Sequence, residues 1–414
     1  MKRSILFTMS LLLLFLLLVC SVSSISQTID PRLEDLNDFC KTLEKRHKNL
    51  FARISKREFE MEKQKITEKI PEMSDSEFYY SLKHLLSLVG DAHTTLAFSD
   101  SQYKHLSALG FAIAKFNDNW HLMILEKENE KYLGSKLIAI NDVDISEVYN
   151  RAKGIMSYEN EVWAENNFSN TINFREALEY LGIVEKGGPI VLKVEDSSGN
   201  RELLEIKSMN EEEIMNAQFS YLVQHNTPKT VLRGYYSAME INKNAYYIQY
   251  NSCQEAPDLP MKEFISFVSE VIKENYYKKV IIDLRYNSGG NSSIFEPMIS
   301  ELSKLQKKKD FTVYTIIGRN TFSSAIINAI QIDDKLNNVF VGTPTGGNVN
   351  GYGEIKSFNL KNTPITVLYS TKYFELIKGY EKDSLYPDIF VEQSFEDYLN
   401  GVDTVVEMIL QIED

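Results

Sequence analysis

The sequence predicts an α/β protein with a helical N-terminal segment, a mainly β middle domain and a C-terminal core in which strands alternate with helices. The main observation is that the apolar period changes twice along the chain. It is helical up to about residue 100, alternates over short runs between residues 101 and 209, and becomes a strand–helix alternation over residues 230–414. The length of 414 residues is enough for two or three domains.

The first 26 residues have the features of an export signal. Lys2 and Arg3 precede an uncharged apolar run that ends at Cys20, and small polar residues follow to Ser26. A cleaved signal over residues 1–26 is the first interpretation. An uncleaved membrane anchor is the second, because the run with its flank is about long enough to cross a bilayer, and a lipoprotein signal is the third. Each predicts a protein that is secreted or anchored at the outer face of the cell membrane.

Residues 27–100 are expected to form a helical domain. Apolar residues recur at helical spacing from Pro31 to about Ser87, with charged residues between them, and Gly90 is a common kind of helix terminator. Residues 101–209 are expected to form a compact β domain. Turn residues such as Asn117-Asp118-Asn119 separate its short apolar runs.

The C-terminal core, residues 230–414, is expected to contain a mainly parallel sheet covered by helices. The alternation of apolar strand-like runs with longer helical patterns is typical of that arrangement. The expected strands are 245–250, 279–284, 311–318 and 339–342, and the expected helices are 260–274, 294–305 and 325–332.

Composition excludes several classes of function. The net charge of −13 argues against a nucleic-acid partner but is compatible with a peptide or protein substrate. Outside the leader, Cys40 and Cys253 can form at most one disulfide. The six histidines show no metal-ligand spacing, and there is no HExxH motif, so we expect neither a metal nor a cofactor.

The strongest single candidate for chemistry is Ser323, in the segment from Gly318 to Ala325. An expected strand ends at Gly318 and an expected helix begins beside Ser323. Free backbone N–H groups and the helix dipole at such a junction favour developing negative charge, and the N–H of Ser324 would face an oxyanion. The alternative is that Ser323 is simply a helix N-cap.

A second candidate is the loop that follows the strand ending at Asp283. Its paired glycines, Gly289 and Gly290, would let the backbone approach a ligand closely and expose its N–H groups. A Gly-rich turn is the alternative. Loops that follow neighbouring parallel strands converge at one end of a sheet, so this loop and Ser323 are expected to lie together.

These two segments, with the loop Gly342–Gly347 and the later Pro387-Asp388-Ile389, resemble the tail-specific (C-terminal processing) protease family. The resemblance covers residues 240–392, with the motifs in the family's order. It implies a ββα (crotonase-like) serine protease core and hydrolysis of peptide bonds through an acyl-enzyme. Ser323 would be the nucleophile, with Ser324 as the alternative. The amides of Gly289, Gly290 and Ser324 would form the oxyanion hole.

The general base departs from the family's commonest pattern. Many members use a Ser/Lys dyad, but the position that matches the lysine is Asn348, and the nearest lysine, Lys356, is displaced. The tricorn branch has a Ser/His/Glu arrangement instead. The segment Gly90-Asp91-Ala92-His93 resembles that branch and implies that His93 is the base.

The same branch implies a glutamate that orients the histidine. The matching position, counted back from Pro387, is Glu381. Asp383 and Asp91 are the alternatives for this role. Such a carboxylate would stabilise the imidazolium that forms during catalysis.

The middle segment is similar to a PDZ-like domain. Gly134 to Asn141 resembles one of its motifs, and Ser107 to Ile113 resembles its carboxylate-binding loop. The resemblance implies that a peptide C-terminus would add as an edge strand. A plain β domain is the alternative.

Two other functions stay open. The missing lysine, and Ile326 or Ile327 at the position of a family glutamate, favour a catalytically inactive peptide-binding protein on the same fold. An acyl-transferring or esterase activity on the same residues is the third hypothesis.

Overall fold

The computed structural model describes residues 30–97, 106–223 and 225–413. The predicted signal or anchor over residues 1–26 lies outside them, so possible attachment to a membrane stays a prediction. Within the described ranges no helix has both the length and the apolar character needed to span a bilayer. Cys40 and Cys253 are both buried free thiols. The α/β class predicted from the sequence is confirmed.

Three helices form most of the N-terminal domain. They are α2 (Pro31–Arg46), α3 (Lys56–Lys69) and α4 (Asp75–Ser87). Ser55 and Ser74 begin α3 and α4 with capping boxes, in which the serine side chain and a glutamate satisfy the free N–H groups of the first turn. The buried faces of the helices form one apolar cluster.

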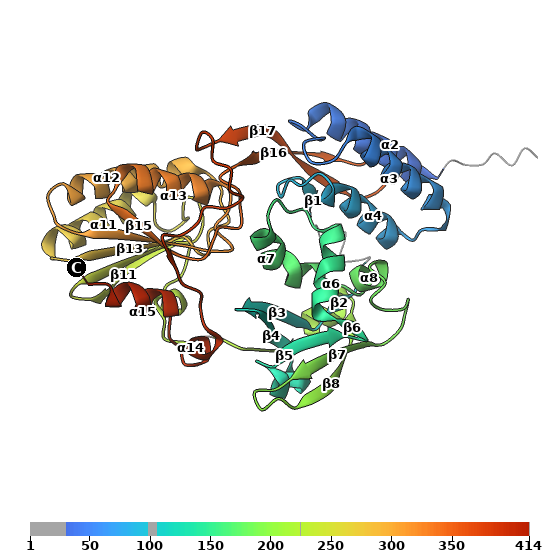
Figure 1. The fold of residues 1–414 in the computed structure, drawn as a ribbon, viewed down its shortest axis with the longest axis horizontal. Coiled ribbons are helices and arrows are strands. Elements are labelled where there is room, and N and C mark those ends of the chain that lie inside the picture. Colours follow the sequence, from blue (N-terminus) through green and yellow to red (C-terminus); the bar gives the residue numbers. More distant parts are fainter. Residues whose placement is uncertain (1–29, 98–105, 224, 414) are drawn as a thin grey trace, which may run out of the picture.

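This helical domain is completed by a hairpin from the other end of the chain. Strand β1 (Thr95–Ala97) pairs with β17 (Thr366–Glu375), which pairs with β16 (Asn350–Asn359). Val367 and Tyr369 of β17 are buried in the same apolar cluster as α2 and α4. In Figure 1 the hairpin reaches from the C-terminal core to the N-terminal helices. The hairpin therefore ties the first and last parts of the chain together.

The middle domain has a mainly antiparallel sheet in the order β10-β4-β5-β7-β8, with β3 beside β4 and β6 beside β5, and a separate β2–β9 pair. Its strands are β2 (Ala108–Leu109), β3 (Phe111–Phe116), β4 (Asn119–Glu126), β5 (Lys136–Ile140), β6 (Val143–Asp144), β7 (Ile190–Glu195), β8 (Arg201–Ile206), β9 (Ser208–Met209) and β10 (Phe219–Tyr221). Its helices are α6 (Ile145–Ala152), α7 (Glu161–Thr171), α8 (Arg175–Tyr180) and α9 (Glu211–Asn216).

Helix α7 covers the edge of β3 that does not pair with β4. The backbone N–H of Ile113 donates to Ser169 Oγ on α7 (3.0 Å). The carbonyl of Lys115 accepts from Arg319 Nη1 of the core (3.0 Å). A peptide that added to this edge would have to displace both bonds. The mode of peptide binding stays a prediction.

The C-terminal core is a six-stranded sheet in the order β11-β12-β13-β14-β15-β18, parallel except for the β11–β12 pair. Its strands are β11 (Tyr236–Asn242), β12 (Ala245–Tyr250), β13 (Lys279–Asp283), β14 (Thr312–Ile317), β15 (Asn338–Gly342) and β18 (Ile389–Phe390). Its helices are α10 (Pro228–Val231), α11 (Met261–Glu274), α12 (Glu296–Gln306), α13 (Ser324–Lys335), α14 (Phe395–Leu399) and α15 (Thr404–Gln411).

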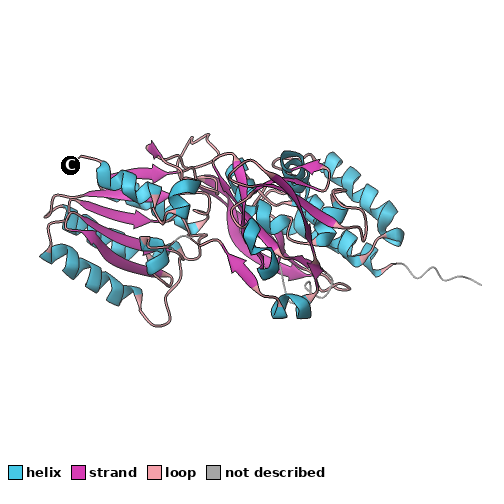
Figure 2. Cartoon of the chain, turned by 90° about the horizontal axis from the view of Figure 1, so that it is seen from below, coloured by secondary structure: helices cyan, strands magenta, loops and turns pink. Residues whose placement is uncertain are grey.

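The two faces of this sheet are buried under different helices. Helices α11, α12 and α13 pack on one face, and α15 packs on the other. Figure 2 shows the core at one end of an elongated molecule, with the C-terminus marked. Because both faces are covered, only the ends of the strands and their loops can present polar groups to a ligand.

Candidate active site

Ser323 is the last residue of the loop that joins β14 to α13. Its backbone has φ 55° and ψ −123°, a left-handed conformation that is unusual for a residue with a side chain. Its side chain makes no capping hydrogen bond, so a cap does not account for this serine. Instead, Ser323 Oγ lies 3.1 Å from Nε2 of His93. Such strained conformations cluster at functional sites, because the surrounding structure must over-determine them.

His93 follows α4 and lies two residues before the start of β1. Its ring stacks on Phe322 with centroids 4.5 Å apart, and Phe322 stacks on Trp163 of α7 with centroids 4.0 Å apart. The residue is 9% exposed. Burial lowers the pKa of His93 below its usual value, against the opposing charge of Asp91. The imidazole is therefore neutral at physiological pH and able to accept a proton.

Asp91 is the carboxylate nearest to the histidine in this segment. Its Oδ1 accepts the backbone N–H of His93 (2.9 Å) and lies 3.8 Å from Nδ1 of the ring. Its Oδ2 makes hydrogen bonds with Nε2 of His47 (3.0 Å) and with the Thr94 hydroxyl. Burial acts to raise the pKa of Asp91, but these hydrogen bonds outweigh it and hold the pKa below its usual value. Asp91 is thus a fixed negative charge beside His93.

The paired glycines lie against the serine. Gly289 has φ 108°, and a Cβ there would come within 2.8 Å of Ser323 Cβ. Gly290 has φ 131°, and a Cβ there would come within 2.4 Å of the Cys253 carbonyl oxygen. Only glycine combines these backbone angles with so close an approach. The sequence prediction that the two loops meet is confirmed by this contact.

Two of the three predicted oxyanion donors are free. Within the described part of the chain no acceptor bonds the backbone N–H of Gly290 or of Ser324. The N–H of Gly289 already donates to Asn287 Oδ1 (2.9 Å). The hydroxyl of Ser324 donates to the Gly290 carbonyl (2.7 Å). Ser324 is thereby engaged in holding the loop, which favours Ser323 over Ser324 as the nucleophile.

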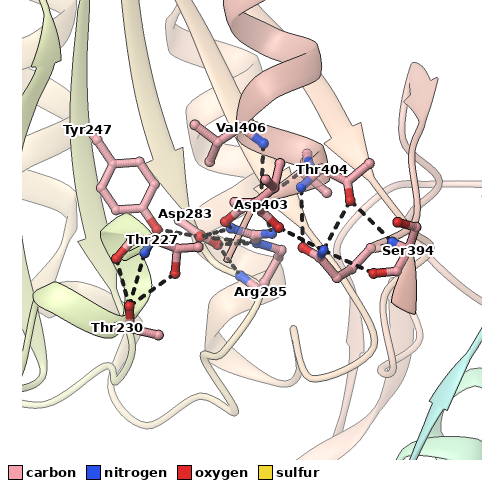
Figure 3. Close-up of polar contacts among 12 residues, drawn as sticks. Thr227, Thr230, Tyr247, Asp283, Arg285, Ser394, Asp403, Thr404 and Val406 are labelled. Atoms are coloured by element: carbon pink, nitrogen blue, oxygen red, sulfur yellow. Dashed lines mark hydrogen bonds and ion pairs between the residues drawn. The ribbon is translucent and has the colours of Figure 1, made fainter. Parts of the chain in front are cut away.

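A buried ion-pair network lies where β13 leads into this loop, and Figure 3 shows its side chains. Arg285 bridges Asp283 at the end of β13 and Asp403 at the start of α15, with Nη2 at 2.6 Å and 2.7 Å from their carboxylates. The Tyr247 hydroxyl donates to Asp283 Oδ2 (2.6 Å). Because every charge in the network has a partner, the strand end that leads into the glycines is rigidly held.

The carboxylates expected near Pro387 lie elsewhere. Glu381 is exposed, and within the described residues it makes no hydrogen bond or ion pair with His93. Asp383 is also exposed, and its carboxylate accepts from the Tyr386 hydroxyl (3.2 Å). Of the three carboxylates considered from the sequence, the structure brings only Asp91 to His93. A role for Glu381 stays a prediction.

The structure adds a buried acid that sequence reasoning missed. Glu159 is 6% exposed and precedes α7. Side-chain donor atoms of Asp91, His93 and Glu159 all lie within 4.8 Å of one another. This spacing could suit a cation, but both Asp91 oxygens already accept hydrogen bonds, so we assign no metal here. No motif in the sequence marks Glu159, because it comes from the middle domain.

A cleft of about 410 Å³ opens beside Ser323. Its apolar wall comes from the start of α13 and the loop before it, the loop before β16, the β16–β17 hairpin and the residue after β17. The apolar residues are Phe322, Ile327, Val349, Ile355, Phe374 and Leu376. No lysine of the described residues lines it: Asn348 stands in the wall, and Lys356 points to solvent on β16. The site therefore offers a histidine, and not a lysine, to the serine.

Comparison with known proteins adds a likeness of fold. No protein-family model matches the sequence, and no curated protein matches it. Mature CPAF complexed with lactacystin superposes with a TM-score of 0.61 at 11% identity, covering 89% of this chain and 95% of that one. A serine-to-alanine variant of CPAF superposes with a TM-score of 0.63 at 12% identity, covering 92% and 98%. This chain therefore shares the CPAF fold over nearly its whole described length.

Proposed function

We propose that the protein is a serine peptidase that hydrolyses peptide bonds through an acyl-enzyme, with Ser323 as nucleophile and His93 as general base. The observation that carries this function is the 3.1 Å contact between Ser323 Oγ and His93 Nε2. The two residues are 230 positions apart in the chain. A serine and a neutral histidine at hydrogen-bond distance are the parts that nucleophilic acyl transfer needs.

In the first half of the reaction, His93 Nε2 takes the hydroxyl proton as Ser323 Oγ bonds to the carbonyl carbon. The oxyanion that forms faces the free amides of Gly290 and Ser324. His93 then gives its proton to the leaving amine as the C–N bond breaks. In the second half, water loses a proton to His93 and attacks the acyl-enzyme, which releases the acid and restores Ser323.

Asp91 supports this cycle through charge. The imidazolium formed at His93 lies 3.8 Å, through its Nδ1, from an ionised Asp91 oxygen. The hydrogen bonds from His47 and Thr94 keep that carboxylate in place. Peptide bonds are the proposed substrate because the Ser323 and Gly289-Gly290 segments resemble those of tail-specific proteases.

A fluorophosphonate probe tests the function, because it reacts only with an activated serine. The protein from about Gln27 onward is labelled and measured by intact mass, beside Ser323→Ala, His93→Ala and Ser324→Ala. We expect labelling in the wild type and in Ser324→Ala, and none in the other two. Absence of labelling in the folded wild type would favour the inactive peptide-binding alternative.

Peptide and small-ester substrates, assayed side by side, then separate a peptidase from an esterase. A peptidase cleaves both, and its peptide activity is lost with Ser323→Ala. Ester cleavage without any peptide cleavage would support the esterase alternative.

We also propose that the enzyme acts outside the cytoplasm. The export signal read from residues 1–26 supports this location. N-terminal sequencing of the protein secreted by its cell tests it. A mature start near Gln27 is expected for a cleaved signal, and an intact Met1 on a cytoplasmic protein would contradict export.

A further inference from the structure

Glu159 has an unusual environment for an acid. Three parts of the chain meet around it: the segment after α4 with Asp91 and His93, the loop after α2 with Arg53, and the loop before β16 with Asn348. Arg53 Nη1 donates to the backbone carbonyl of Glu159 (2.8 Å). No Lys or Arg of the described residues lies within ion-pair distance of its carboxylate, although the charge of Arg53 and the backbone of Ala92 act to lower its pKa. Burial of a carboxylate without an ion-pair partner is costly, so the protonated form of Glu159 is favoured.

Its side chain holds one wall of the cleft. Glu159 Oε1 accepts the backbone N–H of Asn348 (2.7 Å). The next residue, Asn160, donates to the side chain of Asn348 (3.1 Å) and to the Asp383 carbonyl (2.7 Å). Two consecutive residues of the middle domain therefore fix the loop where the family carries its lysine.

The same segment also supports the histidine. Trp163, in the first turn of α7, stacks on Phe322, which stacks on His93. Nδ1 of His93 is buried, with no close hydrogen-bond partner among the described residues, and the backbone of Tyr352 acts to raise the pKa of the ring. It lies in the group of Asp91, His93 and Glu159 whose donor atoms are within 4.8 Å of one another. The start of α7 therefore contacts the Phe322 ring, which packs against His93.

We propose that Glu159 is a positioning residue of this peptidase, whose carboxyl group holds the Asn348 loop and the polar side of His93 in the geometry that the Ser323–His93 pair requires. The inference rests on the proposed function. It assigns the middle domain a direct part in assembling the site, beyond any binding of peptide.

Electrostatics agrees with this geometry. Burial raises the pKa of Glu159 to about 8, with Asp91 adding to the rise and Asn348 and Arg53 opposing it. The pKa of Asp91 is held low, so near neutral pH the pair carries a single negative charge beside His93. When two carboxyl groups lie close together, one stays ionised and the pKa of the other is raised, so that it keeps its proton. A neutral amide is therefore the closest mimic of Glu159 at pH 7.

The test uses Glu159→Ala, Glu159→Gln and the control Glu161→Gln, an exposed glutamate two residues away. The fluorophosphonate labelling rate is measured from about pH 6 to 9. We expect Glu159→Ala to label about 10 to 100 times more slowly than wild type, because a small displacement of reacting groups costs that much. Glu159→Gln should label at pH 7 nearly as fast as the wild type. The wild type should show an inflection near pH 8 that Glu159→Gln lacks and Glu161→Gln keeps.

Each outcome is decisive. If the wild type labels and Glu159→Ala labels equally fast, Glu159 has no positioning role, while the proposed function stands. An inflection near pH 8 that persists unchanged in Glu159→Gln also overturns the role. If Glu159→Ala does not fold, the pH profile of Glu159→Gln decides the question. If even the wild type does not label, the proposed function fails first and the inference fails with it.

Discussion

The two sides of the cleft are built in different ways. On the proposed nucleophile side, Ser323 and the Gly289-Gly290 loop follow neighbouring strands of one sheet. On the base side, His93 comes from the helical domain and Glu159 from the middle domain, and both meet the core only through tertiary contacts. The nucleophile side therefore belongs to a single sheet, whereas the base side depends on how three parts of the chain dock.

The largest effect is expected when either of the two proposed reacting groups is removed. Ser323→Ala and His93→Ala should each lower peptide cleavage by roughly 10⁴-fold or more, because the two residues act as a unit. The double variant should be little worse than either single one. Initial rates on a fluorogenic peptide measure this. Additive losses in the double variant would show that the pair does not act together.

The next prediction concerns the contact between the glycine loop and Ser323. Gly289→Ala should lower the labelling rate by roughly 10²- to 10³-fold, because its Cβ would meet Ser323 Cβ at 2.8 Å and displace the oxyanion loop. Gly199→Ala is the matched control. Gly199 also has positive φ, at 83°, but nothing lies within 4 Å of its Cβ position. Equal losses in both variants would mean that general destabilisation, and not the contact with Ser323, is the cause.

Asp91→Asn tests the charge on the base side. We expect a loss of about 10²-fold in the labelling rate, because the imidazolium loses its nearest negative charge. Asp91 opposes the fall in the pKa of His93, so the variant should have a lower His93 pKa. The labelling rate falls at acidic pH, where His93 becomes protonated, and in the variant this fall should occur at lower pH than in the wild type. A fall at the same pH in both proteins would show that Asp91 acts only by packing.

The last prediction concerns stability and not activity. Because burial raises the pKa of Glu159 to about 8, the folded state holds this proton more tightly than the unfolded chain does. Its stabilising contribution is complete below about pH 4.5 and is lost as the pH rises to 8. The wild type should lose up to about 4 kcal/mol of unfolding free energy over this window relative to Glu159→Gln, at about 1.4 kcal/mol for each pKa unit. Chemical denaturation of both proteins at pH 5 and pH 8 measures the difference. The same change in unfolding free energy between the two pH values in both proteins would contradict the prediction.

Much of the nucleophile side could be predicted from the sequence. The strand-to-helix junction at Ser323 and the paired glycines are patterns of a few residues, and the structure places them in contact. His93 was also predicted, through its resemblance to a family segment, and it lies beside Ser323. The occupied amide of Gly289 was not foreseen, because the bond from this amide to Asn287 depends on a side-chain rotamer.

The sequence by itself determined the α/β class and the residues whose backbone demands are local: apolar periods specify strands and helices, and glycines mark positive φ. Only the tertiary structure decided that β16 and β17 complete the N-terminal domain, that Glu381 faces solvent, and that Glu159 lies beside His93. The physical reason is the range of the interactions. Periodicity and backbone conformation are encoded over a few neighbouring residues, whereas the docking of distant segments depends on how whole buried surfaces fit together.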